Sequence, residues 1–216
     1  IQGRLSTPDN GFQECPENWE REFNLLKELN LSHIDWVITQ GSFKNNPIFF
    51  EDLNGYSINS ICADNLVDRC IFRELESNLV PICNAAIRNN IKNITIPLEA
   101  ELEAEKLLQI VNLRDNFFVT YDTGNITSCG FDHEKYINLV KHKLDNVHLK
   151  DRTFDAKTVE PLTGDTNFKL IFKTLSDVGY NGLYTLQTMR GEHGNETNVI
   201  SRHRKIFQEL LSEESI

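Results

Sequence analysis

The sequence predicts an α/β fold, a (β/α)8 barrel of the TIM type in one domain over residues 1–216. Short β-rich runs alternate with longer helical patterns along the whole chain, which is typical of parallel strands joined by right-handed crossovers. No Gly-rich phosphate-binding turn follows the first strand, which argues against a doubly wound open sheet. Polar residues recur where several strands end, as they do at the mouth of a barrel.

The expected strands are short and rich in β-branched and aromatic residues. They cover residues 1–5, 33–39, 56–63, 93–98, 117–121, 146–149 and 183–186. Residues 19–29 and 72–88 place apolar side chains at helical spacing, and the Glu-, Ala- and Leu-rich segment after Glu99 is the clearest helical pattern. Helices and strands therefore alternate as a barrel requires.

Composition and charge narrow the class of protein. With 39% hydrophobic residues and 13 Phe, the chain can bury a substantial core. A net charge of −10, from 32 acidic against 22 basic residues, argues against a nucleic-acid-binding protein, because phosphate contacts need basic patches. No apolar run is long enough to span a membrane. The five cysteines lack a CxxC pair, which favours free thiols in a reducing compartment and predicts a cytoplasmic protein.

Four residues with metal-ligating side chains stand at or just past the apolar part of a strand: Glu99, Asp122, His148 and Gln187. Their spacings of 23, 26 and 39 residues suit about one βα unit each. In a parallel barrel such positions converge on the mouth. Two carboxylates, one imidazole and one amide oxygen predict a site for one divalent ion, Mn²⁺, Mg²⁺, Co²⁺ or Zn²⁺.

Each of these residues also has a purely structural interpretation. Glu99 suits the first turn of a helix, where the helix dipole favours an acid. Asp122 begins Asp-Thr-Gly-Asn, which suits an ordinary turn. A lone His in a strand, such as His148, is often a core residue, and Gln187 alone indicates little. Only the joint placement of the four residues favours a metal site.

Eight segments carry a resemblance to a known family: Gln2-Gly-Arg-Leu-Ser6, Trp19-Glu-Arg-Glu-Phe23, Ile61-Cys-Ala-Asp64, Pro97-Leu-Glu99, Tyr121-Asp-Thr-Gly-Asn125, His148-Leu-Lys-Asp-Arg152, Gly164-Asp-Thr-Asn-Phe168 and Leu186-Gln-Thr-Met-Arg190. In this order the chain resembles the sugar phosphate isomerase/epimerase family of xylose-isomerase-like barrels. The resemblance runs over nearly the whole chain.

The resemblance implies a metal-dependent isomerase or epimerase of carbohydrate metabolism that acts on a small sugar or sugar phosphate through an enediolate. It places the family's metal-ligand roles on Glu99, Asp122, His148 and Gln187. Glu99 is then a candidate catalytic base. Gln187 stands where the family has a second Glu, and an amide cannot accept a proton as a carboxylate does. The family's second His, shortly after the Asp of the sixth strand, also has no counterpart before His133.

Other residues near the predicted ligands complete the candidate site. Asp64 and Asp151 are candidates for the role that Gln187 cannot fill, Asp151 as a catalytic and Asp64 as a substrate-binding residue. Lys150, as a catalytic residue, and Arg190, as a substrate-binding one, are candidates to clamp a phosphate or carboxylate of the substrate. Both could instead be solvated charges at the rim.

Two rival functions stay open. One is a non-catalytic descendant that binds a sugar or a protein partner, which Gln187 favours. The other is a metal-dependent apurinic endonuclease, which the six His and the acidic charge disfavour. The expected partners are a small carbohydrate or sugar phosphate, without nucleic acid or membrane, and the chain is a candidate homo-oligomer.

The strand count is one short of eight, and a barrel needs closure to remove unpaired edges. The family pattern places a strand, a helix and a second strand between Phe72 and Glu99, where this sequence shows one helix and one strand. The chain also begins with Ile1. The sequence therefore predicts a longer natural protein, with residues absent near Ala85 to Ile94.

Overall fold

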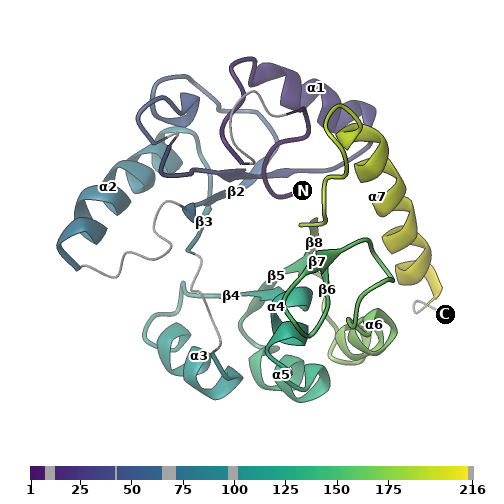
Figure 1. Cartoon of the computed structure of the whole chain (residues 1–216). Coiled ribbons are helices and arrows are strands. Elements are labelled where there is room, and N and C mark those ends of the chain that lie inside the picture. Colours follow the sequence, from purple (N-terminus) through teal and green to yellow (C-terminus); the bar gives the residue numbers. More distant parts are fainter. Residues whose placement is uncertain (8–12, 42, 65–71, 97–101, 214–216) are drawn as a thin grey trace. The chain divides into compact units, whose positions relative to one another are not determined.

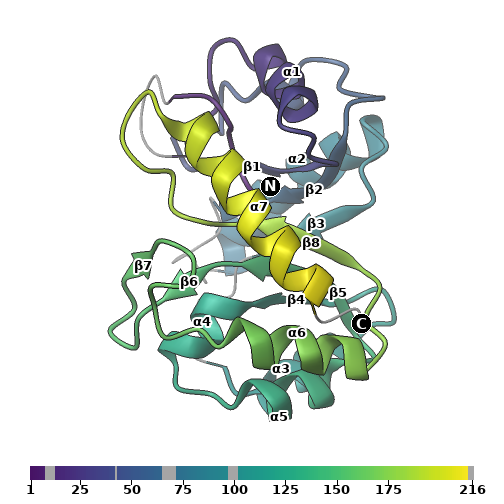
Figure 2. The ribbon, with the colours of Figure 1, turned by 90° about the vertical axis from the view of Figure 1, so that its right-hand side faces the viewer.

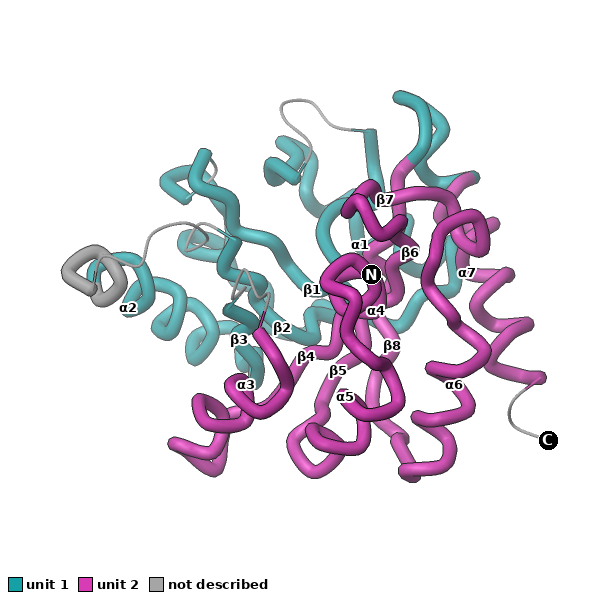
Figure 3. Tube along the Cα trace, turned by 60° about the horizontal axis from the view of Figure 1, so that its bottom comes forward, with its two compact units in different colours: residues 1–99, 191–198 teal, residues 100–190, 199–216 magenta. Residues whose placement is uncertain are grey.

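The computed structural model describes the chain except residues 8–12, 42, 65–71, 97–101 and 214–216. The described residues divide into two compact units, residues 1–99 with 191–198 and residues 100–190 with 199–216 (Figure 3). Within these ranges no helix combines the length and apolar character needed to cross a membrane.

Unit 1 is built on a parallel sheet (Figure 1). Its elements are α1 (Glu20–Glu28), β1 (Ile34–Val37), the 3-10 helix η1 (Pro47–Phe49), β2 (Ile58–Cys62), α2 (Phe72–Arg88) and β3 (Asn93–Thr95). The strands pair in the order β1-β2-β3, and Gln2 adds an isolated parallel bridge to Asp35. Of the predicted first strand, residues 1–5, the structure has a single bridge. Strands β1, β2 and β3 lie within the predicted strands 33–39, 56–63 and 93–98.

An aromatic cluster fixes α1 on this sheet. Phe23 of α1 stacks on Trp36 of β1 with ring centroids 5.8 Å apart, and the Tyr56 ring lies 4.3 Å from the Phe23 ring. The buried carboxylate of Glu22 accepts hydrogen bonds from the backbone N–H groups of Leu5 and Ser6. These contacts hold the end of the first strand against the helix.

Unit 2 repeats the same construction (Figures 1 and 2). Its elements are α3 (Ala104–Val111), β4 (Val119–Asp122), α4 (Thr123–Ser128), α5 (His133–Val140), β5 (Leu144–Leu149), β6 (Asp151–Arg152), β7 (Thr158–Val159), α6 (Phe168–Asp177) and β8 (Leu183–Leu186). The parallel strands pair in the order β4-β5-β8, and β6 and β7 form an antiparallel hairpin that the sequence did not predict. Helix α7 (Glu196–Glu213) begins in the 191–198 segment and continues into unit 2.

The two faces of the β4-β5-β8 sheet differ in chemistry because side chains alternate along each strand. Tyr121, Val147, Leu149 and Leu186 are buried on the apolar face. Helices α3, α5 and α6 lie along one side of this sheet (Figures 1 and 2). The ring centroids of Tyr121 and of Tyr136 in α5 lie 5.9 Å apart, and those of Phe172 in α6 and of Tyr184 also lie 5.9 Å apart. The opposite face carries the candidate site.

The parallel α/β architecture and the order of its elements are as the sequence predicts. Among the described residues, the main strands form two three-stranded sheets rather than one continuous ring. The connection from α2 to β3 is an ordinary helix end: Asn90 has a positive φ of 54°, and the Ile91 N–H bonds back to Ala86 at 2.9 Å. The predicted absence of residues near Ala85 to Ile94 stays a prediction.

Candidate active site

The candidate site occupies the polar face of the β4-β5-β8 sheet. Asp122 is paired in register with His148, and His148 is paired with Thr185. Register partners in parallel strands carry their side chains on the same face, about 5 Å apart. Lys150 follows His148 by two residues and so lies on this face too. The Gln187 N–H bonds to the Leu149 carbonyl at 3.0 Å, which places Gln187 beside Lys150. We call Asp122, His148, Lys150 and Gln187 the polar set.

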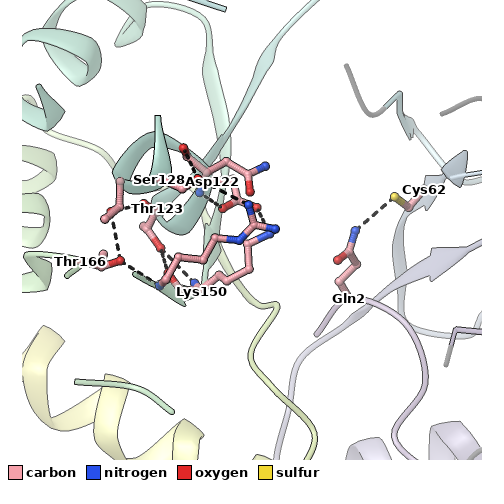
Figure 4. A network of polar contacts seen from close by, with 10 residues as sticks. Gln2, Cys62, Asp122, Thr123, Ser128, Lys150 and Thr166 are labelled. Atoms are coloured by element: carbon pink, nitrogen blue, oxygen red, sulfur yellow. Dashed lines mark hydrogen bonds and ion pairs between the residues drawn. The ribbon is translucent and has the colours of Figure 1, made fainter. Parts of the chain in front are cut away.

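Asp122 and Lys150 form an ion pair in the polar set (Figure 4). The Lys150 Nζ lies 2.9 Å from the Asp122 Oδ2, and only 8% of the lysine and 12% of the aspartate side chain are exposed. Asp122 also caps α4, since its Oδ1 accepts the Asn125 N–H at 2.8 Å. Each carboxylate oxygen therefore accepts one described hydrogen bond and has a further lone pair for a ligand.

The turn after β4 is locked onto the end of β5. The Thr123 hydroxyl donates to the Lys150 carbonyl at 2.7 Å and accepts the Lys150 N–H at 3.0 Å (Figure 4). Gly124 permits this close approach, because a Cβ there would lie 3.0 Å from the Lys150 Cγ and 3.1 Å from the Arg152 Cγ. The Asp-Thr-Gly-Asn motif therefore positions the Asp122 carboxylate at the lysine.

Three buried polar atoms beside the polar set have no hydrogen-bond partner in the described part of the chain. They are the Gln187 Oε1, the Asn125 Oδ1 and the Arg152 Nε. Leaving a buried polar atom unpaired costs free energy, so such atoms commonly mark a place where a ligand or ion binds. The sequence analysis did not single out Asn125 and Arg152 as functional residues, although both lie inside motifs that it noted.

The remaining predicted site residues are not gathered in the polar set. Glu99 lies outside the described residues. Asp64 belongs to unit 1, just beyond β2, and is exposed. Asp151 is buried, and its carboxylate accepts the N–H groups of Gly164 at 3.0 Å and Thr166 at 3.3 Å, so it anchors the loop after β7. Arg190 is buried, 5% exposed, in the segment that follows β8.

A second polar network supports the end of β8. The fully buried imidazole of His203 in α7 bonds through Nδ1 to the Thr188 hydroxyl at 2.9 Å and through Nε2 to the Glu160 carboxylate at 2.7 Å. Burial lowers the pKa of His203, against the opposing effect of Glu160. This network fixes the residue that follows Gln187.

The described donors fit a divalent ion in part. Within the described ranges, no three His, Cys, Asp or Glu side chains are grouped closely enough to hold an ion. Asp122, His148 and the unpaired Gln187 Oε1 supply one carboxylate, one imidazole and one amide oxygen. Three such donors are of the kinds that bind divalent ions, but they are fewer than the roughly four to six ligands that such ions usually take.

Comparison with known proteins identifies the family. Residues 71–210, more than half of the chain, match the family model described as a xylose isomerase-like TIM barrel. The chain belongs to this family. The predicted barrel class and the resemblance to xylose-isomerase-like sugar isomerases and epimerases are therefore confirmed. No relative among the curated proteins matches the sequence.

Solved structures share this fold at low sequence identity. A xylose isomerase domain protein from Planctomyces limnophilus is 13% identical, with a TM-score of 0.70 over 99% of this chain and 98% of that one. The IolI protein, solved with a binding zinc atom, is 14% identical, with a TM-score of 0.71 over 93% and 95%. The D-psicose 3-epimerase from Clostridium cellulolyticum H10, solved with D-tagatose, is 12% identical, with a TM-score of 0.59 over 98% of both chains.

Proposed function

We propose that this chain is a divalent-metal-dependent isomerase or epimerase of a small sugar or sugar phosphate. The observation that carries the proposal is the polar set, in which Asp122 and His148 are register partners and the buried Gln187 Oε1 has no described partner. The zinc-bound IolI protein and the D-psicose 3-epimerase, which share the fold, support the metal and the sugar.

The proposed ligands of the ion are Asp122, His148, Gln187 and Glu99. When bound, the ion would polarise a substrate carbonyl and so acidify the neighbouring C–H. Glu99 is the proposed base, because the Gln187 amide cannot take a proton. Lys150 and Arg152 supply positive charge beside Asp122, which suits the negative charge that develops on a sugar oxygen or a substrate phosphate. Asp151 acts indirectly, by anchoring the loop that ends at Thr166.

A second candidate function is a non-catalytic descendant that binds a sugar or a partner. The buried pair of Lys150 and Asp122 favours it, because the ammonium already neutralises the carboxylate. With Gln187 in place of an acid, the described donors carry little net negative charge. The affinity of a site for a hard cation decreases as its ligands carry less negative charge, so these features weaken metal binding.

Metal content and turnover test the proposed function together. The purified full chain should retain about one divalent ion, and Mn²⁺ should support interconversion of ketoses or their phosphates. Chelation should abolish this turnover. Glu99→Gln should lower turnover by about two orders of magnitude or more, because general base catalysis contributes that much, without lowering the melting temperature.

Glu103→Gln is the matched control, since the Glu103 side chain is 58% exposed and lies four positions away. Its turnover should match that of the unchanged protein. A protein that binds sugar but neither retains metal nor turns over any ketose would establish the non-catalytic function instead. Full activity in Glu99→Gln would assign the base to another residue.

A further inference from the structure

Unit 1 holds a groove of about 440 Å³ between the segment that leads through η1 and helix α2. One wall carries Phe43, Phe49 and Phe50, and the other carries Pro81, Asn84 and Arg88. The volume lies in the range of roughly 300–1,000 Å³ that small-molecule sites occupy. The polar set belongs to unit 2, and none of its four residues is among the described residues that line this groove.

The first wall presents an aromatic surface. The rings of Phe43 and Phe49 lie 5.2 Å apart in a tilted arrangement, and those of Phe49 and Phe50 lie 6.4 Å apart edge to face. Phe50 is 69% exposed. Aromatic groups gain stability from further ring contacts and from removal of this area from water. The wall therefore favours a ligand with a planar apolar body.

The groove is positively charged although the chain as a whole is acidic. Lys44 and Arg88 line it, and no Asp or Glu is found among its described lining residues. Arg88 donates from Nη2 to the Ile48 carbonyl at 2.6 Å, which orients its guanidinium toward η1. A guanidinium has five N–H donors in a planar fork that matches a carboxylate. The exposed Asn84 amide adds a donor and an acceptor on the same wall.

Hydrogen bonds connect the segment through η1 with the C-terminal end of α2. The buried Asn89 side chain accepts the Leu53 N–H at 2.7 Å and donates to the Ile48 carbonyl at 3.2 Å and to the Ala85 carbonyl at 2.9 Å. Asn46 caps η1 by accepting the Ile48 N–H at 3.1 Å. These contacts preorganise the groove, which reduces the entropic cost of binding.

We propose that this groove binds a small aromatic carboxylate. Its ring packs against Phe49 and Phe50, and its carboxylate pairs with the guanidinium of Arg88. Charge complementarity favours an anion, and the aromatic wall favours a planar apolar body. The groove is thus proposed as a second ligand site, whose lining residues include no member of the polar set.

Titration of the full chain with 1-naphthoate, followed by ligand-observed NMR and calorimetry, tests the proposal. Arg88→Gln should weaken binding about tenfold, the loss expected for one charge-assisted hydrogen bond. Phe50→Ala should weaken it several-fold. The neutral isostere 1-naphthamide should bind the unchanged protein about tenfold more weakly than the acid.

Arg114→Gln is the matched control, because Arg114 is an exposed arginine in unit 2 and should leave binding unchanged. Arg88→Lys keeps the positive charge, and its melting temperature reports whether the bond to Ile48 is needed for folding. If Arg88→Gln fails to fold, Phe50→Ala decides alone, since its ring is mostly exposed. Absence of naphthoate binding at millimolar concentration, or equal binding in Phe50→Ala and the unchanged protein, would overturn the proposal.

Discussion

The parallel sheets of the two units share a construction and differ in the chemistry of their polar faces. In unit 1 the described side-chain hydrogen bonds of the sheet join neutral donors to nearby acceptors. The Gln2 amide donates to the Cys62 thiol at 3.2 Å (Figure 4), the Thr95 hydroxyl donates to the Ser60 hydroxyl at 3.4 Å, and the buried Asp35 carboxylate accepts the Asn59 amide at 2.8 Å. In unit 2 the face carries a buried ion pair, an imidazole and an amide oxygen without a described partner.

This difference indicates that the polar residues of the two sheets have different roles, stabilisation in unit 1 and binding in unit 2. Hydrogen-bonded neutral groups stabilise a core. Burial is the main cause that raises the pKa of the Cys62 thiol to about 12, with smaller contributions from the Asp64 and Asp35 carboxylates, and this keeps the thiol protonated and unreactive. A buried charge pair beside an unpaired oxygen contributes little net stability, since its desolvation is costly. The polar set therefore suits binding and chemistry better than folding, and three measurements test this contrast.

The largest expected effect comes from breaking the ion pair of the polar set. Asp122→Asn keeps the cap on α4 but leaves the Lys150 ammonium buried without its partner. Removing one member of a buried pair costs about 3–5 kcal/mol, so urea unfolding should show a loss of that order. The double variant Asp122→Asn/Lys150→Met should recover most of it, because no charge is then left buried.

The exposed pair of Lys135 and Glu105, 3.1 Å apart, is the matched control. Glu105→Gln should not change the urea midpoint measurably, since solvent screens that pair. An equal effect in Asp122→Asn and Glu105→Gln would contradict a buried pair and would remove the contrast between the two sheets.

A second expected effect concerns the pH dependence of unit 2. His133 bonds to the Tyr121 and Thr127 hydroxyls behind the β4-β5-β8 sheet, and burial lowers its pKa to about 4 from 6.5. Between pH 6.5 and about 4, His133 is protonated in the unfolded chain and neutral in the folded chain. The stability contributed by His133 is therefore full above pH 6.5 and is lost as pH falls toward 4, by up to about 3 kcal/mol.

Urea unfolding at several pH values measures this slope. His133→Gln should flatten it between pH 6.5 and 4, because glutamine does not titrate. His142→Gln, a change of an exposed histidine in the same unit, should leave it intact. An unchanged slope in His133→Gln would assign the acid sensitivity to carboxylates elsewhere.

The sequence predicted the architecture well because strand and helix periodicity are local properties. Asp122 and His148 could be predicted as neighbours because both end parallel strands, and such ends meet at one edge. The ion pair of Asp122 with Lys150 could not be predicted, because the direction of a long side chain depends on neighbours from other strands. The burial of Asp151 was hidden for the same reason: its partners, Gly164 and Thr166, lie across the hairpin of β6 and β7.

The groove of unit 1 was also beyond sequence analysis. Nothing in the sequence distinguishes Phe43, Phe49 and Phe50 from Phe residues of the core, since Phe is mostly buried in proteins. The exposure of Phe50 depends on how η1 and α2 pack, and the side chains of Arg88 and Asn89 connect these two elements through the Ile48 carbonyl. Composition indicates how large a core the chain can form, but it does not show which aromatic residues remain exposed.

The smallest expected effect separates a binding role of Gln187 from a folding role. The Gln187 Oε1 is buried and has no hydrogen-bond partner in the described part of the chain, so in metal-free buffer it costs free energy. Gln187→Met removes this oxygen at similar volume and should stabilise the protein by about 1 kcal/mol.

Mn²⁺ should then raise the melting temperature of the unchanged protein but not of Gln187→Met, because a ligand stabilises only the state that binds it. Gln187→Glu adds a charge to the donor set and should increase the Mn²⁺-induced shift. Destabilisation of Gln187→Met in metal-free buffer would show that the amide supports the fold, and the polar face of unit 2 would then resemble that of unit 1.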